Sequence, residues 1–278
     1  MTHLSDSTLD HLREVADLPD LTGTRYSIEG EIGRGGLGVV YAALDSHLER
    51  RVAIKVLDSV DEARVIANLE HPAIVPVYEA GTLPDGRAFY AMKLVDGTRL
   101  DRYLGEHRSM SERLRVIQRI GEALAFAHSR GVLHRDMKPQ NVMIGSFGEV
   151  YVMDWGVAGV AGTPDFRAPE QARGTEVDQR SDVYALGALL VFVLPEEAPR
   201  ALKAIAAKAM RVTPDDRYPA VSAMLLDLQR FQDGLAVEAH PESLWQRSWR
   251  FAVRNRVLLL LLAAYVAVRL FLFLLRRV

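Results

Sequence analysis

The chain contains no cysteine, so disulfide bonds and thiol chemistry are excluded. It also has no acidic residue after Glu242, whereas seven arginines lie there. The remaining 27 basic residues stand against all 36 acidic ones, so residues 1–246 carry a formal net charge of −9. An acidic globular part argues against nucleic-acid binding, which requires basic surfaces that neutralise phosphates. Residues 1–20 contain no long apolar run, and we therefore expect no signal peptide.

The apolar residues divide the chain into two parts. Before Gly97, short apolar runs separated by Gly, Pro and Asp predict an antiparallel sheet, with strands at Val39–Ala43, Val52–Val56, Ile74–Val77 and Ala88–Val95. One helical stretch, Val60 to Leu69, interrupts them. After Gly97, apolar residues at helical spacing predict helices at Leu114–His128, Val183–Val193, Ala201–Met210 and Val221–Phe231. The predicted fold class is α+β, with a β-rich lobe, a hinge near residues 95–97 and an α-rich lobe.

A glycine-rich loop is the first candidate site. The sequence from Gly33 to Val40 is G-R-G-G-L-G-V-V, and strand-like residues follow its last glycine. A dinucleotide-binding loop requires a helix at that point, so we favour a phosphate-covering flap between two strands. For this loop alone, a plain hairpin turn stays an alternative. Lys55 ends the next apolar run, and after such a loop it is better interpreted as a phosphate-pairing lysine than as an edge residue.

The segment His134–Asn141, H-R-D-M-K-P-Q-N, is the most specific in the chain. Phosphoryl transfer needs a carboxylate to orient the attacking hydroxyl, metal ligands and cations near the developing charge. Here Asp136 offers the base, Lys138 the cation and Asn141 an oxygen ligand for a hard metal ion. Asp154 follows a second apolar run thirteen residues later. Each piece alone could be a surface charge cluster or a turn, but their order matches the protein-kinase signature.

With these motifs, residues 25–234 resemble the bacterial eukaryotic-type (Hanks-type) serine/threonine protein kinases, as a compact membrane-anchored member. The segments Leu69–Val75, Phe89–Val95 and Arg167–Gln171 add to the resemblance. It implies a bilobal protein-kinase-like fold, with a lead-in at residues 1–24, an N-lobe at 25–96 and a C-lobe at 97–235. It also implies ATP and Mg²⁺, or Mn²⁺ in its place, as cofactors. The acceptor would be a protein hydroxyl, and the K-P-Q-N wording favours serine and threonine by family analogy.

The resemblance assigns roles to matching positions. The residues expected in catalysis are Asp136 as base, Lys138, Lys55, Glu62 and Thr163. Those expected to hold the metal ion are Asn141 and Asp154. Those expected around ATP are Ile32, Gly33, Arg34, Gly35, Gly36, Leu37, Gly38, Val40, Ala53, Lys55, Met92, Lys93, Val95 and Met143. Among these, Met92 would be the gatekeeper, and the Lys93 carbonyl and Val95 amide would face the adenine edge.

The resemblance also implies residues that support the site. Glu170 would form an ion pair with Arg217, and Asp182 would brace the catalytic loop. A regulatory stack of side chains would consist of His134, Trp155, Ile66 and Val77. Glu62 has a second interpretation, because Ser59-Val60-Asp61-Glu62 matches a helix capping box. We favour its ion pair with Lys55 over that capping role.

The chain departs from the family by being shorter in regulatory regions. Between Asp154 and Glu170, Thr163 is the only residue with a hydroxyl group. We therefore expect no activation by loop phosphorylation, with Asp165 as a fixed negative charge for Arg135. The interval between Asp182 and Arg217 is also compact, which removes a region that docks substrates in the family. These departures motivate an alternative function, a nucleotide-binding pseudokinase or scaffold; a kinase-fold enzyme for a small molecule is less favoured.

The C-terminal segment predicts membrane attachment. Residues 257–275 are apolar except for Arg269, and as a helix they would extend about 28 Å, marginally enough to cross a bilayer. The basic juxtamembrane segment 236–256 would hold the kinase on the cytoplasmic face of the inner membrane, as a single-pass protein. A buried or in-plane amphipathic helix is the alternative. Few residues follow the span, so we expect no sensor domain beyond it. The expected partners are protein substrates, membrane lipid, and a membrane partner or second copy.

Overall fold

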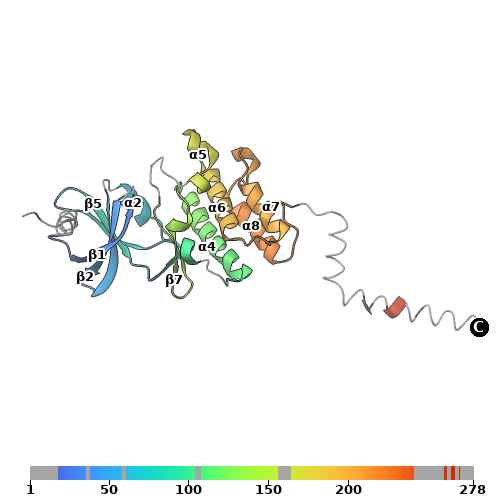
Figure 1. The fold of residues 1–278 in the computed structure, drawn as a ribbon, viewed down its shortest axis with the longest axis horizontal. Coiled ribbons are helices and arrows are strands. Elements are labelled where there is room, and N and C mark those ends of the chain that lie inside the picture. Colours follow the sequence, from blue (N-terminus) through green and yellow to red (C-terminus); the bar gives the residue numbers. More distant parts are fainter. Residues whose placement is uncertain are drawn as a thin grey trace, which may run out of the picture.

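The computed structural model describes residues 18–35, 38–57, 61–103, 108–155 and 164–240, and near the C-terminus 260, 261, 264–266 and 269. Side chains at residues 61–63 and 164 are outside this description. The described chain forms two lobes, a sheet-rich one and a helical one, which lie side by side along the long axis (Figure 1). The predicted bilobal α+β fold is therefore confirmed.

The first lobe, the N-lobe, is a five-stranded antiparallel sheet in the order β1-β2-β3-β5-β4. Its strands are β1 (Tyr26–Gly35), β2 (Gly38–Asp45), β3 (Arg50–Leu57), β4 (Val77–Thr82) and β5 (Ala88–Lys93). One helix, α2 (Asp61–Ala67), contacts β4. The predicted runs at 39–43, 52–56 and 88–95 coincide with β2, β3 and β5.

The predicted strand at Ile74–Val77 is wrong, because β4 begins only at Val77. The preceding residues turn toward the other lobe, where Ile74 forms an isolated parallel bridge with Val152. Val152 donates to the Ala73 carbonyl at 2.8 Å, and the Val75 N–H donates to the Val152 carbonyl at 3.4 Å. The apolar run is therefore buried by contact with the other lobe. The periodicity of the sequence does not distinguish such a bridging segment from a buried strand of the sheet.

The second lobe, the C-lobe, has a small sheet of β6 (Gly97–Arg99), β7 (Val142–Gly145) and β8 (Val150–Val152). Its helices are α3 (Leu100–Tyr103), α4 (Met110–Ser129), α5 (Pro169–Arg173), α6 (Gln179–Val193), α7 (Arg200–Ala209) and α8 (Val221–Gln232). Short 3-10 helices lie at Pro139–Asn141, Pro164–Phe166 and Pro214–Asp216. The four helices predicted from periodicity are confirmed as α4, α6, α7 and α8, with ends that differ by a few residues.

The local sequence explains the two long helices. Ser109 caps α4 in a capping box with Glu112, which satisfies backbone N–H groups that have no partner within the helix. The helix then buries one apolar face, which includes Leu114, Ile117 and Leu124. In contrast, α6 is buried over most of its length and contacts α4, α7 and α8, so it forms the centre of the lobe. A side chain at Gly187 would lie 2.7 Å from Ala209, and this glycine therefore permits the close packing of α6 on α7.

No helix within the described ranges is long and apolar enough to cross a bilayer. The predicted span at 257–275 falls outside the described residues except for a few positions, and so does most of the basic segment 236–256. Membrane attachment therefore stays a prediction.

Candidate active site

The glycine-rich loop connects β1 and β2, as expected for a flap between two strands. Gly35 pairs with Gly38 and Gly33 pairs with Val40 across the hairpin. Gly38 has φ +121°, and a Cβ there would lie 2.1 Å from the Val56 carbonyl oxygen, so only glycine fits. Gly36 and Leu37 are outside the described residues. The exposed Arg34 side chain pairs with Glu31 at 2.7 Å, and Ile32 is also exposed.

Lys55 lies in β3, in the middle of the sheet, where it pairs with Val40 on one side and Tyr90 on the other. Its side chain is only 3% exposed, and its Nζ lies 2.8 Å from Asp154 Oδ1. A buried ammonium group requires such an anionic partner. The two residues are 99 positions apart in the sequence, and their contact joins the N-lobe sheet to the segment that follows β8. Asp154 has a positive φ of 59°, a conformation that non-glycine residues rarely adopt.

Asp136, Lys138 and Asn141, predicted to act together, form a compact polar cluster. The Lys138 ammonium group donates to Asp136 Oδ2 at 2.7 Å. The Asn141 side-chain N–H donates to the Asp136 carbonyl oxygen at 2.7 Å and to Asp136 Oδ2 at 3.3 Å. Because the amide nitrogen of Asn141 is used in these bonds, its amide oxygen is the atom left to act as a metal ligand. The Met153 N–H donates to the Asn141 carbonyl at 2.9 Å and so joins this loop to Asp154.

The donor set fits a hard divalent cation. Asp154 offers a carboxylate and Asn141 an amide oxygen, and Mg²⁺ in proteins prefers one or two such oxygen ligands together with phosphates and water. The described residues contain no cluster of three or more His, Cys, Asp or Glu side chains that could hold a metal ion without a substrate. The roles of Asn141 and Asp154 as ligands stay predictions.

Asp182 holds the segment His134–Asn141 in place through hydrogen bonds to its backbone. Its carboxylate accepts the His134 N–H at 2.9 Å, the Arg135 N–H at 3.0 Å and the His128 Nε2 at 2.7 Å. Burial acts to raise the pKa of Asp182, but the hydrogen bond with His128 and the interactions with His134 together outweigh it and lower that pKa. Arg135 has a positive φ of 66°, and these hydrogen bonds hold it in that strained conformation.

His134 lies against the segment that carries Asp154. Its ring is 4.8 Å from the Trp155 ring, and its Nε2 is 2.9 Å from the Met153 carbonyl. Complete burial lowers the pKa of His134, which keeps its ring neutral. Ile66 and Val77, the other members of the predicted stack, belong to the same apolar core as Trp155.

Glu170 and Arg217 form the predicted ion pair. The guanidinium group of Arg217 donates to both carboxylate oxygens at 2.7 Å, and Ser181 Oγ donates at 2.6 Å. Burial acts to raise the pKa of Glu170, but these hydrogen bonds outweigh it and lower that pKa. Gln171, next in α5, donates to the Arg135 carbonyl at 2.7 Å and thereby connects the pair to the catalytic loop.

Several predicted residues lie at the junction of the lobes. Ala53 and Met92 pair across β3 and β5, and both are buried. Val40 and Val95 are partly buried against the main core, and Met143 lies in β7 opposite Tyr151. The hinge follows Lys93, whose N–H donates to the Pro76 carbonyl at 3.0 Å. Their contacts with ATP stay predictions.

The structure does not confirm the roles predicted for Glu62 and Thr163, nor the one predicted for Asp165. The side chain of Glu62, together with Ser59 and Thr163, is outside the described residues, so their roles stay predictions. Arg135 and Asp165 are both described and both exposed, and they form no ion pair with each other. The expectation that Asp165 supplies a fixed charge to Arg135 is therefore not supported by the geometry.

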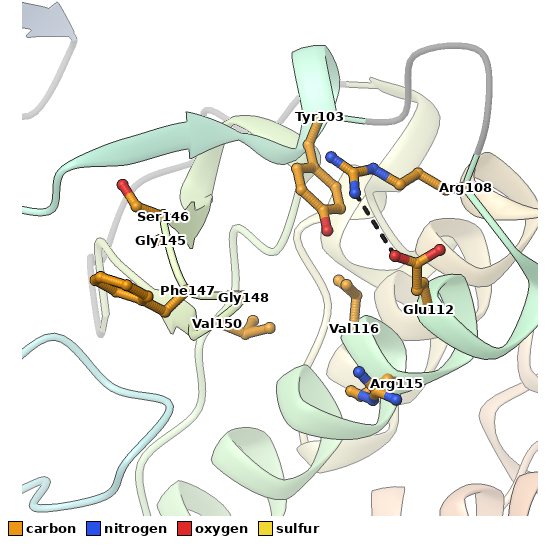
Figure 2. Close-up of a pocket in the computed structure, with 10 residues that line it drawn as sticks. All are labelled: Tyr103, Arg108, Glu112, Arg115, Val116, Gly145, Ser146, Phe147, Gly148 and Val150. Carbon is orange, nitrogen blue, oxygen red and sulfur yellow. Dashed lines mark ion pairs between the residues drawn. The ribbon is translucent and has the colours of Figure 1, made fainter.

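A separate pocket of about 290 Å³ lies on the C-lobe, between α3, the first turns of α4 and the β7–β8 hairpin. Figure 2 shows Tyr103, Arg108 and Glu112 on one side of it and the hairpin residues Ser146 and Phe147 on the other. Arg108 and Glu112 form an ion pair at 3.6 Å. No residue predicted for catalysis, ATP or metal lines this pocket, so it is distinct from the candidate site.

Sequence reasoning assigned no role to His128, Gln171 or Tyr151. The only available signal was for His128, a polar residue that continues the buried face of α4 after Leu124. Gln171 and Tyr151 carry no local signal, because their partners are 36 and 58 residues away.

Residues 26–236 match the family model described as protein kinase domain. The chain is 30% identical to the serine/threonine-protein kinase PknD of Chlamydia caviae, over 76% of this chain and 31% of that protein. It is 34% identical to the serine/threonine-protein kinase PknB of Mycolicibacterium smegmatis, over 80% of this chain and 45% of that protein. The chain thus spans about 31% to 45% of the length of these relatives. The crystal structure of the Mycobacterium tuberculosis PknI kinase domain is similar, with a TM-score of 0.62 and 26% identity over 77% of this chain and 98% of that one.

Proposed function

Because the chain belongs to the protein kinase family, we propose that it is an ATP-dependent serine/threonine protein kinase, which transfers the γ-phosphate of ATP to a protein hydroxyl. The observation that carries this proposal is the cluster of Asp136, Lys138 and Asn141, together with the Lys55–Asp154 pair. Both relatives are named serine/threonine-protein kinases, which supports the serine/threonine preference.

Each residue then has a chemical task. Asp136 would orient the acceptor hydroxyl and take its proton, and Lys138, already 2.7 Å from that carboxylate, would stabilise negative charge on the transferred group. Lys55 would pair the α- and β-phosphates. Bound Mg²⁺ would offset the charge of the phosphates, held by Asn141 and Asp154. Gly38 permits the glycine-rich flap to pack against β3, because a Cβ there would meet the Val56 carbonyl, and the flap would cover the phosphates.

The experiment is phosphate transfer from γ-labelled ATP with Mg²⁺, using the full chain and a generic protein substrate. We expect transfer by the wild type, and a loss of it in Asp136→Ala and Lys55→Met. Asp85→Asn is the matched control, because it also removes an aspartate charge but lies in an exposed pair with Arg87 in the N-lobe. Phosphoamino-acid analysis should find phosphoserine or phosphothreonine. Transfer by the wild type no greater than by Asp136→Ala would contradict the proposal.

A pseudokinase or scaffold is the second candidate, motivated by the short region between Asp182 and Arg217. The relatives found are named as kinases, and the residues needed for transfer are all present, so we favour the enzyme. The same assay separates the two, since a pseudokinase would bind ATP but transfer no phosphate.

We further propose that residues 257–275 attach the kinase to the inner membrane, with the catalytic lobes on the cytoplasmic side. The support is the sequence alone: an apolar segment preceded by four arginines within residues 247–256. The test is membrane fractionation of the full chain against a version that ends at His240. We expect the full chain in the alkali-resistant membrane fraction and the shortened one in the supernatant. Recovery of both in the supernatant would refute attachment.

A further inference from the structure

Lys93, the last residue of β5, reaches with its side chain from the N-lobe sheet to the C-lobe. Its Nζ donates to the Tyr151 hydroxyl at 2.5 Å and lies 4.5 Å from the centre of that ring. Tyr151 lies in β8, pairs with Met143 of β7 and is only 7% exposed, so the small sheet of the C-lobe holds the tyrosine in place. The hydrogen bond with Tyr151 raises the pKa of Lys93, and the lysine therefore stays a cationic donor at neutral pH.

The side chain of Lys93 is not placed to contact ATP. Successive side chains of a strand point to opposite faces, so Lys93 points away from the face on which Met92 lies. Met92 is opposite Ala53, and both are expected near the adenine. Only the backbone of Lys93 is expected to meet the nucleotide, which leaves its side chain for another task.

The Lys93–Tyr151 contact lies where three segments meet. The N–H of Lys93 donates to the carbonyl of Pro76, and Val152, next to Tyr151, exchanges hydrogen bonds with Ala73 and Val75. The end of β5, residues 73–76 and β8 are thus joined at one point, directly before the hinge. The Lys55–Asp154 pair also joins the N-lobe sheet to the C-lobe, but from the side of the candidate site.

We propose that Lys93 and Tyr151 form a clasp that positions the two lobes at the hinge and thereby strengthens ATP binding. The inference rests on the proposed function, because it assumes that ATP binds between the lobes. A hinge that is already ordered loses less conformational freedom when the nucleotide binds. The side chains of Lys93 and Tyr151 thus act on ATP binding by positioning the lobes, not by contact with the phosphates or the acceptor hydroxyl.

The test uses Lys93→Met and Tyr151→Phe in the full chain. Lys93→Met keeps the apolar stem and removes the donor, and Tyr151→Phe keeps the ring and removes the hydroxyl. We expect either variant to raise both the KM for ATP and the Kd for a fluorescent ADP by about threefold to tenfold, which corresponds to the net contribution of one ordinary hydrogen bond. The kcat should change by less than about twofold, since the loss is in binding and not in the transfer step. The double variant should be no weaker than either single one, and Lys93→Arg should restore most of the affinity.

The matched control is Lys208, whose Nζ lies 4.4 Å from the centre of the Tyr218 ring within the C-lobe. Lys208→Met also removes an ion pair with Glu238 and should lower the melting temperature without a change in KM or Kd. The proposal is overturned if Lys93→Met and Tyr151→Phe behave like Lys208→Met. If the wild type binds ADP but transfers no phosphate, and Lys93→Met still weakens binding, the kinase function fails and the clasp stands. A wild type that binds no nucleotide would refute the clasp as well.

Discussion

The C-lobe contains two groups of charged residues that use the same chemistry in different surroundings. We call the first the open charges: Asp136, Lys138 and Asp154, whose side chains are 13%, 21% and 33% exposed. We call the second the buried charges: Asp182, Glu170 and Arg217, with 2%, 8% and 0% exposure. The open charges bond mainly to one another and to Lys55 and Asn141. The buried charges bond to backbone N–H or carbonyl groups and to further side chains as well.

This difference separates reacting groups from positioning groups. A charge that must meet a substrate has to stay accessible, and it loses its protein partners at little cost when the substrate replaces them. A charge that is fully buried is stable only if all its hydrogen-bonding positions are used, and its removal leaves a partner without compensation. Substitutions in the two groups should therefore separate activity from stability.

The largest expected effect is on activity. Asp136→Ala should lower the rate of phosphate transfer by about 10²-fold to 10⁴-fold, because it removes the group that orients the hydroxyl and accepts its proton. The melting temperature should stay near that of the wild type, since the carboxylate is partly exposed. Parallel measurement of transfer rate and thermal unfolding checks both statements. A large loss of stability would move Asp136 into the group of buried charges.

The next effect is on stability. Arg217→Met should lower the free energy of unfolding by about 3–5 kcal/mol, because it leaves the Glu170 carboxylate buried without its cation. Urea denaturation of the full chain measures the loss. The control is the double variant Glu170→Gln with Arg217→Met, which removes both charges and should recover part of that free energy. No recovery would mean that packing, and not charge, accounts for the loss.

A pH series sharpens the same comparison. The pKa values of Glu170 and Asp182 are lowered below their ordinary values of 4.5 and 3.8, because hydrogen bonds from Arg217 and Ser181 and from His128 outweigh burial. Their stabilising contributions are therefore complete above those ordinary values and are lost as the pH falls through the lower folded-state values. We expect urea midpoints to fall steadily below about pH 4.5. The double variant without the Glu170–Arg217 pair should show a shallower fall, and an identical fall would contradict this assignment.

The smallest effect concerns one hydroxyl group. Ser181→Ala removes the 2.6 Å hydrogen bond to Glu170 and leaves the bidentate contact with Arg217 intact. The free energy of unfolding should fall by about 1 kcal/mol, and the rate of transfer should not change. Ser146→Ala, which removes a surface hydrogen bond to the Asp96 carbonyl, is the control for loss of an exposed hydroxyl. Equal losses of unfolding free energy in the two variants would show that burial does not strengthen the hydrogen bond between Ser181 and Glu170.

The sequence predicted the lobes, the glycine-rich hairpin and most helices, because each has a local signal in glycine position or apolar periodicity. It also indicated the Glu170–Arg217 pair, but only through the family resemblance. The strand predicted at Ile74–Val77 was wrong, since a buried apolar run has the same appearance in a strand and in a bridge to another lobe. The contacts His128–Asp182 and Lys93–Tyr151 could not be predicted, because they depend on how distant segments pack.

The most direct test of this account compares two isosteric substitutions, Asp136→Asn and Asp182→Asn, by transfer rate and melting temperature in the same preparation. We predict that Asp136→Asn loses nearly all transfer with an unchanged melting temperature. Asp182→Asn should lower the melting temperature clearly, because the amide no longer provides a charged acceptor for His128 and for the N–H groups of His134 and Arg135. Equal losses of stability in the two variants, or full transfer by Asp136→Asn, would contradict the division into open and buried charges.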